Sequence, residues 1–271
     1  MKVLGLSKFN PKILKIGGSV ITDKSKELQV RMQVINRLAE EIQKASIQNL
    51  VIVHGGGSFG HPLAQKYAIS EGLKEETQKH GFSETHHVMT VLNGLFMDAL
   101  IWRDIPAVSI TPSSCIIAKD GRIEIFEDTP LRILLKLGFL PVLYGDAVLD
   151  LNLGFTIVSG DQLVSILAIK LNAEHVIVGV DVDGLYADDP KIKKSARIFR
   201  HLTLDELRKQ LDRIRKPESC DVTGGMYGKI TELLRAVEYG IPVTIVNAAR
   251  PNYVYKALKG KKVESTSIEK E

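Results

Sequence analysis

Residues 53–61 read VHGGGSFGH, and this stretch indicates both the fold and the chemistry of the molecule. It follows the apolar run 49–53 (NLVIV) and precedes 62–72 (PLAQKYAISEG), which has the pattern of a helix. A glycine has no Cβ, so its N–H can approach a ligand closely and its φ can be positive. Successive N–H groups ahead of a helix form a concave site for anions. The stretch therefore predicts a strand, a phosphate-binding loop and a helix, in that order.

The rest of the chain repeats an alternation of strands and helices. Continuous apolar runs, typical of strands buried on both faces, occur at 12–16, 50–53, 106–110, 141–144, 174–180 and 242–246. Helical periodicity occurs at 30–47, 85–102, 162–171, 204–211 and 227–239. The alternation predicts an α/β fold with a mostly parallel sheet and helices on both faces. Segments 121–128 (GRIEIFED) and 147–160 (AVLDLNLGFTIVSG) alternate instead and predict hairpins, the second turning near 152–154.

Three further glycine or acidic clusters are expected at the edge of the sheet that carries 53–61. They are 15–19 (KIGGS), 181–184 (DVDG) and 221–229 (DVTGGMYGK). A single glycine pair is more often a tight turn than a ligand site. Four such clusters at the carboxyl ends of strands, where open α/β sheets bind ligands, favour a site. The chain lacks the P-loop, the dinucleotide fingerprint and the protein-kinase motifs.

Bulk composition excludes several other functions. The 271 residues are 44% hydrophobic and carry 36 basic and 32 acidic side chains, a balance that gives no sign of nucleic-acid binding. No secretion signal and no apolar run long enough to span a membrane are found. We interpret Cys115 and Cys220 as small core residues in a reducing compartment, and we expect the protein to be cytoplasmic.

Five motifs together resemble the amino acid kinase superfamily and, within it, the isopentenyl phosphate kinases. They are 15–24 (KIGGSVITDK), 53–62 (VHGGGSFGHP), 158–161 (VSGD), 181–186 (DVDGLY) and 221–229. The resemblance covers about 11–257. His61, after GGGSFG, separates this branch from acetylglutamate, aspartate and carbamate kinases.

This resemblance implies a fold, a reaction and a division of the chain. The fold is a single-domain, three-layer αβα sandwich with a mostly parallel central sheet, and the protein is a homodimer. The N-terminal part to about 158 holds the acceptor, and 159–271 holds the nucleotide. ATP, with Mg²⁺, donates its γ-phosphoryl group to isopentenyl phosphate. Residues 1–10 form an extra leader with no assigned role.

Individual roles also follow from the resemblance. The charged groups that carry the transfer are Lys15, Lys24, His61, Asp161 and Lys229. ATP is held by Gly17, Gly18, Ser19, Gly57, Asp181, Asp183, Tyr186, Gly225 and Lys229. The acceptor phosphate is held by Gly56, His61 and Gly160. Asp161 organises the lysines, and no residue is assigned as a metal ligand.

The chemistry of such a transfer needs this set of groups. A phosphate monoester is already nucleophilic, so the obstacle is repulsion rather than deprotonation. Two unit charges 4 Å apart repel by about 4 kcal/mol at an effective dielectric constant near 20. Converging cations and N–H donors offset that repulsion. Lys15, Lys24, Lys229 and the glycine amides are the candidates.

Other interpretations remain open at this level. A phosphonate kinase of the fosfomycin-resistance type could use the same histidine to bind its dianionic acceptor, whereas glutamate 5-kinase, with a carboxylate acceptor, would not need it. A nucleotide sensor without catalysis is a third hypothesis. His54 is expected to be a buried strand-end residue. The candidates for an apolar wall around the acceptor tail are Phe82, His86, Met89 and Phe155.

Overall fold

The computed structural model describes residues 10–271 except 189, 191, 194 and 215–224, and its main sheet has eight strands among these residues. The strand order is β12-β14-β13-β9-β1-β2-β6-β3. Their bounds are β1 Lys12–Ile16, β2 Leu50–His54, β3 Ala107–Ser109, β6 Leu140–Tyr144, β9 His175–Val180, β12 His201–Thr203, β13 Val243–Asn247 and β14 Ser265–Glu269. From β13 to β3 all neighbours are parallel, and β14 pairs antiparallel with β13.

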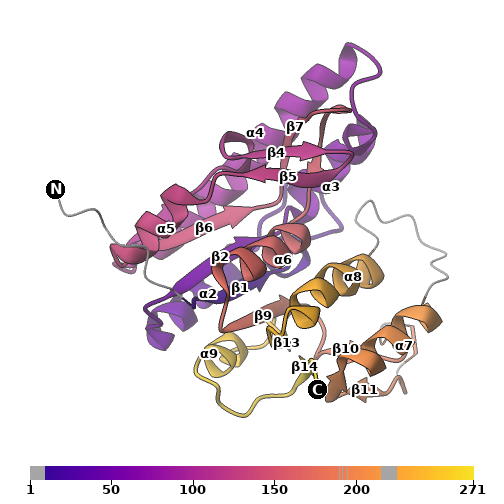
Figure 1. Ribbon diagram of the computed structural model, residues 1–271. Helices are drawn as coiled ribbons and strands as arrows, with labels where there is room; N and C mark the ends of the chain where they lie inside the picture. Colours follow the sequence, from indigo (N-terminus) through magenta and orange to yellow (C-terminus); the bar gives the residue numbers. More distant parts are fainter. Residues whose placement is uncertain (1–9, 189, 191, 194, 215–224) are drawn as a thin grey trace.

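Helices cover both faces of this sheet (Figure 1). Their bounds are α1 Gly18–Ile21, α2 Met32–Ala45, α3 Gly57–Lys66, α4 Thr77–Ile101, α5 Thr129–Lys136, α6 Gly160–Leu171, α7 Leu204–Ile214, α8 Gly225–Glu238 and α9 Tyr253–Leu258. One core cluster unites the sheet with α5, α6, α7 and α8, and the other unites it with α2, α4 and α9. The predicted three-layer αβα architecture is therefore confirmed.

Alternation along the strands explains why both faces are apolar. On β1, Ile13 packs into the first cluster, whereas Leu14 and Ile16 pack into the second. Successive side chains of a strand point to opposite faces, so a strand covered on both faces is mostly apolar. All three side chains are fully buried. Burial on both faces therefore explains the continuous apolar runs in the sequence.

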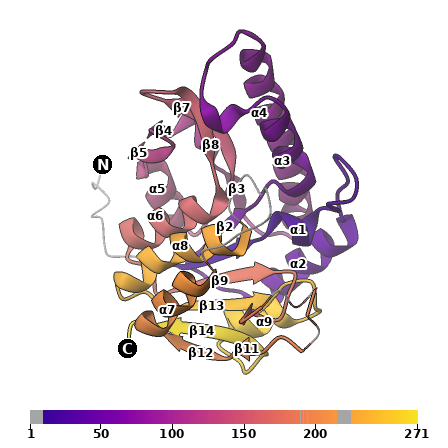
Figure 2. The same ribbon diagram turned by 90° about the vertical axis from the view of Figure 1, so that its right-hand side faces the viewer.

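A second sheet of four strands, in the order β5-β4-β7-β8, stands above the first (Figures 1 and 2). The strands are β4 Ile116–Lys119, β5 Arg122–Phe126, β7 Asp146–Asp150 and β8 Gly154–Val158. The predicted β7–β8 hairpin is confirmed, with Asp150 accepting hydrogen bonds from the N–H groups of Asn152 and Leu153 in its turn. Segment 121–128 supplies only the second strand of its hairpin, because β4 is the first. A short pair, β10 Leu185–Tyr186 and β11 Ile198–Phe199, completes the strands of the described residues.

The prediction that a helix begins near residue 85 is wrong by two turns, since α4 begins at Thr77. The first turns are polar, so they leave no apolar stripe in the sequence. Tertiary contacts stabilise them instead. The side chain of Gln78 accepts hydrogen bonds from the N–H groups of Lys74 and Glu75 at 2.6 and 3.0 Å, and donates to the carbonyl of Tyr67 at 3.0 Å.

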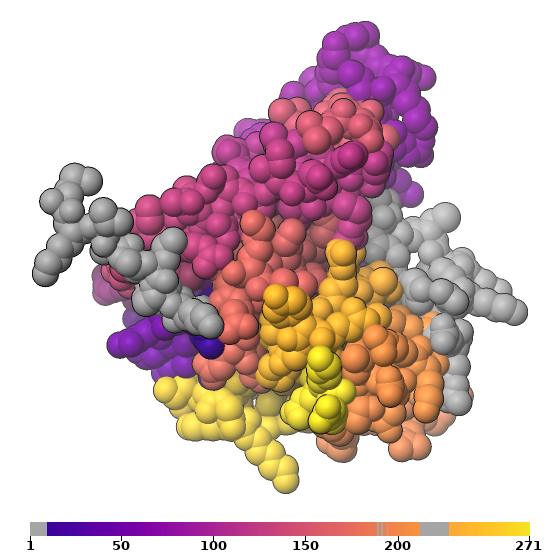
Figure 3. Space-filling model, in the orientation of Figure 1, coloured from indigo at the N-terminus to yellow at the C-terminus, as the bar shows by residue number. Residues whose placement is uncertain are grey.

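The C-terminal elements gather below the second sheet and α5 in the space-filling view (Figure 3). Cys115 is a free thiol, half-buried and packed against the core. Cys220 lies outside the described residues, so the interpretation of that cysteine stays a prediction. None of the helices in the described part of the chain is both long and apolar enough to cross a membrane.

Candidate active site

Two glycine loops leave the sheet side by side. β1 and β2 are parallel neighbours with Ile16 opposite His54, so the segments that follow them emerge at the same edge. A Cβ on Gly18 would lie 2.2 Å from the backbone nitrogen of Gly57. Gly57 itself has φ +52°, and a Cβ there would lie 2.0 Å from Oγ1 of Thr22. These two glycines are needed because one loop packs directly on the other and leaves no room for a side chain.

The loops line a cavity of about 200 Å³ at this edge. Most of the predicted site residues also line it: Lys15, Gly17, Gly18, Ser19, Lys24, Gly56, Gly57, His61, Gly160, Asp161, Asp181 and Lys229. They come from β1, α1 and the segment after it, the β2–α3 loop and α3, the start of α6, the residue after β9, and α8. The structure thus brings together residues that lie more than 200 positions apart in the sequence.

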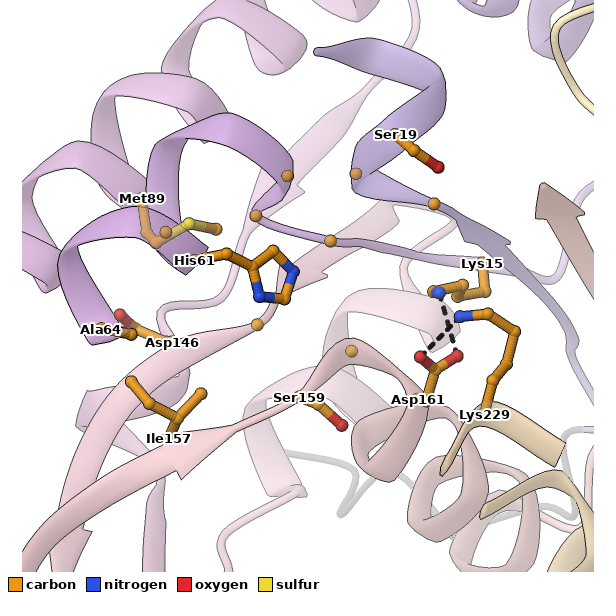
Figure 4. Close-up of a pocket in the computed structure, with 18 of the residues that line it drawn as sticks. Lys15, Ser19, His61, Ala64, Met89, Asp146, Ile157, Ser159, Asp161 and Lys229 are labelled. Carbon is orange, nitrogen blue, oxygen red and sulfur yellow. Dashed lines mark hydrogen bonds and ion pairs between the residues drawn. The ribbon is translucent and has the colours of Figure 1, made fainter. Parts of the chain in front are cut away.

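Two lysines converge on one carboxylate at one end of the cavity (Figure 4). Nζ of Lys15 lies 2.9 Å from Oδ1 of Asp161, and Nζ of Lys229 lies 2.7 Å from Oδ2. The three side chains belong to β1, α6 and α8 and are 4%, 13% and 15% exposed. Asp161 stands in the first turn of α6, whose N-cap Ser159 accepts a hydrogen bond from the N–H of Gln162. The carboxylate therefore fixes the positions of both ammonium groups.

Burial sets the charge state of this cluster. Desolvation lowers the pKa of Lys15 to about 7, and the nearby ammonium of Lys229 lowers it too, while the carboxylate of Asp161 opposes both. Burial alone would raise the pKa of Asp161, but Lys15 and Lys229 outweigh it and hold that pKa below its ordinary value. The carboxylate is charged at neutral pH, whereas Lys15 is only partly protonated, and binding of an anion would favour its protonation.

His61 lies across the cavity from the lysines. It belongs to α3, and its ring points into the space between the glycine loop and the Ser159–Gly160 segment (Figure 4). Ala64, Met89 and Ile157 line the cavity on the same side as this ring. The cavity therefore has a cationic end and an end where a histidine borders apolar side chains and the carboxylate of Asp146.

Two of the predicted nucleotide residues, Asp183 and Tyr186, do not line this cavity. Asp183 accepts hydrogen bonds from Nδ2 of Asn247 at 2.9 Å and from the guanidinium of Arg250 at 2.7 Å. Tyr186 lies in β10, opposite Ile198. Gly225 is the first residue of α8. All three remain predictions as nucleotide contacts.

The predicted apolar wall is divided in the structure. Met89 lines the cavity, whereas the rings of Phe82 and Phe155 pack on each other, with centroids 5.2 Å apart, in a separate apolar cluster. His86 pairs with Asp146 at 3.1 Å. His54 is fully buried, as predicted, and its Nε2 lies 3.2 Å from Oδ1 of Asn93.

Sequence reasoning missed several residues of the cavity, above all Asp146. Its carboxylate is buried, and burial raises its pKa while the neighbouring His86 opposes that shift. Asp146 follows β6 in the sequence LYGD, a glycine–acid pair at a strand end like the pairs that did point to the site. Applying the same criterion to β6 would have found it. The other cavity residues missed are Ala64, Thr85, Gly145, Ile157 and Val180, whereas Gly55, Gly60, Val158 and Ser159 lie within the motifs that pointed to the site.

Comparison with known proteins agrees with this geometry. The profile of the Amino acid kinase family matches residues 10–247. Isopentenyl phosphate kinase of Methanothermobacter thermautotrophicus is 44% identical over 94% of this chain and 98% of its own length. Its counterpart in Methanocaldococcus jannaschii is 37% identical over 95% of this chain and 98% of its own length.

Solved structures give the same result. A solved structure titled "X-ray structures of isopentenyl phosphate kinase" superposes on this chain with a TM-score of 0.85 and is 40% identical in sequence. The match covers 96% of this chain and all of that one. The chain belongs to the amino acid kinase family and, within it, to the isopentenyl phosphate kinases.

Proposed function

We propose that this enzyme transfers the γ-phosphoryl group of ATP to isopentenyl phosphate, giving isopentenyl diphosphate and ADP. An oxygen of the acceptor phosphate forms the new bond to the γ-phosphorus, and the bond from that phosphorus to the β–γ bridging oxygen breaks. The observation that carries the proposal is that one cavity, bordered by the glycine loops, has Lys15 and Lys229 at one end and His61 at the other. Relatives with this named activity match along nearly the whole chain.

Electrostatics explains how these groups promote the transfer. Donor and acceptor phosphates each carry several negative charges, so bringing them together costs more than the roughly 4 kcal/mol per pair of unit charges at 4 Å. Preorganised ammonium groups and N–H donors offset this cost without reorganising during the reaction. Asp161 holds Lys15 and Lys229 in that arrangement before the substrates bind. The protein supplies positions and charges, and the acceptor needs no general base.

The two ends of the cavity suit the two substrates. We assign the acceptor phosphate to His61 with Gly56 and Gly160, because the apolar side chains beyond His61 suit a hydrocarbon tail. We assign the ATP phosphates to the lysine end. The groups proposed there are Gly17, Gly18, Ser19, Lys24, Gly57, Asp181 and Lys229, with Asp183, Tyr186 and Gly225 farther along the nucleotide. In this assignment the part to about 158 supplies most of the acceptor end and also glycines and lysines for the ATP phosphates, whereas 159–271 supplies the rest of the nucleotide site.

Mg²⁺ is proposed to enter with ATP. No group of three or more His, Cys, Asp or Glu side chains among the described residues could hold a metal ion. The oxygens of Asp161, in the middle of the cationic end, already face two ammonium groups. Mg²⁺ commonly binds substrate phosphates with few protein ligands, which fits this site. When bound, it would neutralise phosphate charge alongside Lys15 and Lys229.

A homodimer in the cytoplasm is proposed as the working state. Ile101 and Trp102, at the end of α4, are 52% and 74% exposed, and together they offer an apolar contact for a second copy. Light scattering after gel filtration tests this. A dimer that Trp102→Glu converts to a monomer supports the proposal, whereas a monomeric wild-type protein contradicts it.

A substrate panel tests the reaction. The purified enzyme is incubated with ATP and Mg²⁺ and, in turn, with isopentenyl phosphate, fosfomycin, glutamate or uridine monophosphate, and products are followed by ³¹P NMR. The proposal predicts that kcat/KM is highest for isopentenyl phosphate. Faster turnover of any of the other three acceptors contradicts it, and so does ATP binding without transfer to any of the four.

A further inference from the structure

The tip of the β4–β5 hairpin contacts the two helices that carry the cluster of Lys229 and Asp161. On one side, the guanidinium of Arg122 makes a two-pronged ion pair with the carboxylate of Glu232 in α8, and the second prong is 2.9 Å long. On the other side, the side chain of Gln162 in α6 accepts a hydrogen bond from the N–H of Ile123 at 2.9 Å and donates to the carbonyl of Gly121 at 3.2 Å. Three consecutive hairpin residues thus hold both helices.

Each contact lies beside a residue of the charged cluster. Lys229 and Glu232 are three positions apart in α8, so they share one face of the helix. Gln162 directly follows Asp161 in α6. The hairpin therefore fixes α6 and α8 at the points from which Asp161 and Lys229 reach each other. Both views show the hairpin on the side of the molecule where α6 and α8 lie (Figures 1 and 2).

The hairpin tip is itself held by the acceptor part of the chain. The carboxylate of Asp150, at the end of β7, accepts hydrogen bonds from the N–H groups of Asp120 and Gly121 at 3.2 and 2.9 Å. Nδ2 of Asn152 donates to the carboxylate of Asp120 at 2.9 Å. From β7 the chain runs through β8 to Ser159 and Asp161. A continuous set of contacts thus joins the acceptor part to α8.

Folding stability is only part of what the Arg122–Glu232 pair can supply. The arginine side chain is 46% exposed and the glutamate side chain 15%, so solvent screens part of the attraction between them. A two-pronged guanidinium–carboxylate pair does, however, fix orientation. An error of about 1 Å in the position of a catalytic group can cost about a hundredfold in rate.

Resting on the proposed function, we infer that Arg122 is a positioning residue for phosphoryl transfer: through Glu232 it holds α8 so that Lys229 reaches Asp161 and the transferred group. The residue touches neither substrate. Its effect on the reaction passes through Lys229, and it acts on kcat rather than on acceptor binding.

Arg122→Met tests the inference, with Arg208→Met as the matched control. Arg208 also pairs with a glutamate of α8, Glu238 at 2.7 Å, but at the end of the helix away from Lys229. Arg122→Met is expected to lower kcat about tenfold while KM for isopentenyl phosphate stays within about twofold. Arg208→Met leaves both within about twofold. The exchanged pair, Arg122→Glu with Glu232→Arg, recovers part of kcat.

Two further readouts separate positioning from general damage. In a Lys229→Met background, adding Arg122→Met lowers kcat no further, because the group through which Arg122 acts is already gone. Hydrogen exchange of the amides of 231–237 is faster in Arg122→Met than in Arg208→Met. A full tenfold loss in the Lys229→Met background overturns the inference, as does an unchanged kcat in Arg122→Met. The exchange measurement needs no turnover, so equal exchange overturns the inference even if the wild-type reaction, and with it the proposed function, fails.

Discussion

At the scale of single residues, the charge of the buried side chain of Lys15 depends on whether an anionic ligand is bound. The side chain is nearly inaccessible and shares Asp161 with Lys229, so one carboxylate faces two ammonium groups. Desolvation lowers the pKa of Lys15 to about 7. A bound polyphosphate supplies the missing negative charge and therefore raises that pKa. We therefore expect Lys15 to be fully charged at neutral pH only when the substrates are bound.

Proton uptake on ATP binding follows from this. At about pH 8 much of Lys15 in the free enzyme is neutral, so binding of ATP is expected to draw in up to about one proton per site. At about pH 6 Lys15 is already charged, so the uptake disappears. Calorimetric titrations in buffers with different ionisation enthalpies measure this number. Binding heats at pH 8 that do not depend on the buffer, or uptake that survives Lys15→Met, would contradict the assignment.

His61→Ala is expected to separate the two substrates. Losing a hydrogen bond to a charged group costs about 1.5–3 kcal/mol, so KM for isopentenyl phosphate should rise about ten- to a hundredfold. KM for ATP should change less than about threefold, because His61 lies at the other end of the cavity from the lysines. His87, exposed on α4, provides the control: His87→Ala should leave both constants unchanged. An equal rise in both KM values would refute the role of His61.

Several of the residues that the family motifs singled out also lie in segments where a strand gives way to glycine or acid. Lys15, His61 and Asp161 are of this kind, and all three line the cavity. Arg122 and Gln162 could not be located in this way. Their importance depends on which helix the hairpin tip meets, and nothing in the local sequence records that contact.

At the scale of elements, the glycine loops are tight because two backbones touch. Gly57→Ala forces a Cβ to within 2.0 Å of Thr22 at a φ of +52°. A strain of about 1–3 kcal/mol from the backbone alone, plus the displaced loop, should remove most of the activity. Gly94→Ala in α4, where nothing lies within 4 Å, should instead raise stability by about 0.5–1 kcal/mol. Urea unfolding and kcat/KM of both variants check this, and an active Gly57→Ala enzyme would show that the loops need not touch.

Helices and strands could be predicted where their burial produces a pattern of apolar residues in the sequence. They could not be predicted where contacts with residues distant in the sequence stabilise them instead. Every strand expected from a continuous apolar run is present in the main sheet. The beginning of α4 was missed because Gln78 and its backbone partners stabilise a turn with no apolar stripe. α5, Thr129–Lys136, was not predicted at all; it is short, and only Leu131 and Leu135 of it are buried.

At the scale of the whole molecule, the buried histidine His54 makes the free energy of unfolding depend on pH. Burial lowers the pKa of His54 to about 4, against an ordinary value of 6.5, although its contacts with Gly55 and Asn93 oppose this. Between these values the unfolded chain binds a proton that the folded protein does not, so stability falls as pH falls from 6.5 towards 4. The difference between these two pKa values corresponds to about 3 kcal/mol in the free energy of unfolding.

His54→Gln tests this. The variant keeps a polar group facing Asn93 but cannot titrate. Its free energy of unfolding in urea should decline less than that of the wild type between pH 6.5 and 4.5. Parallel curves for the two proteins would mean that His54 does not contribute to acid sensitivity.

The central claim is that a single cavity holds two mutually repelling phosphates, one beside the lysines and one beside His61. A conjugate that joins adenosine to an isopentenyl group through a polyphosphate chain tests it most directly, by its pattern of inhibition in steady-state kinetics. Because such a molecule fills both ends of the cavity, it should compete with ATP and also with isopentenyl phosphate. Competition with only one of the two substrates would place the other phosphate elsewhere and contradict the account.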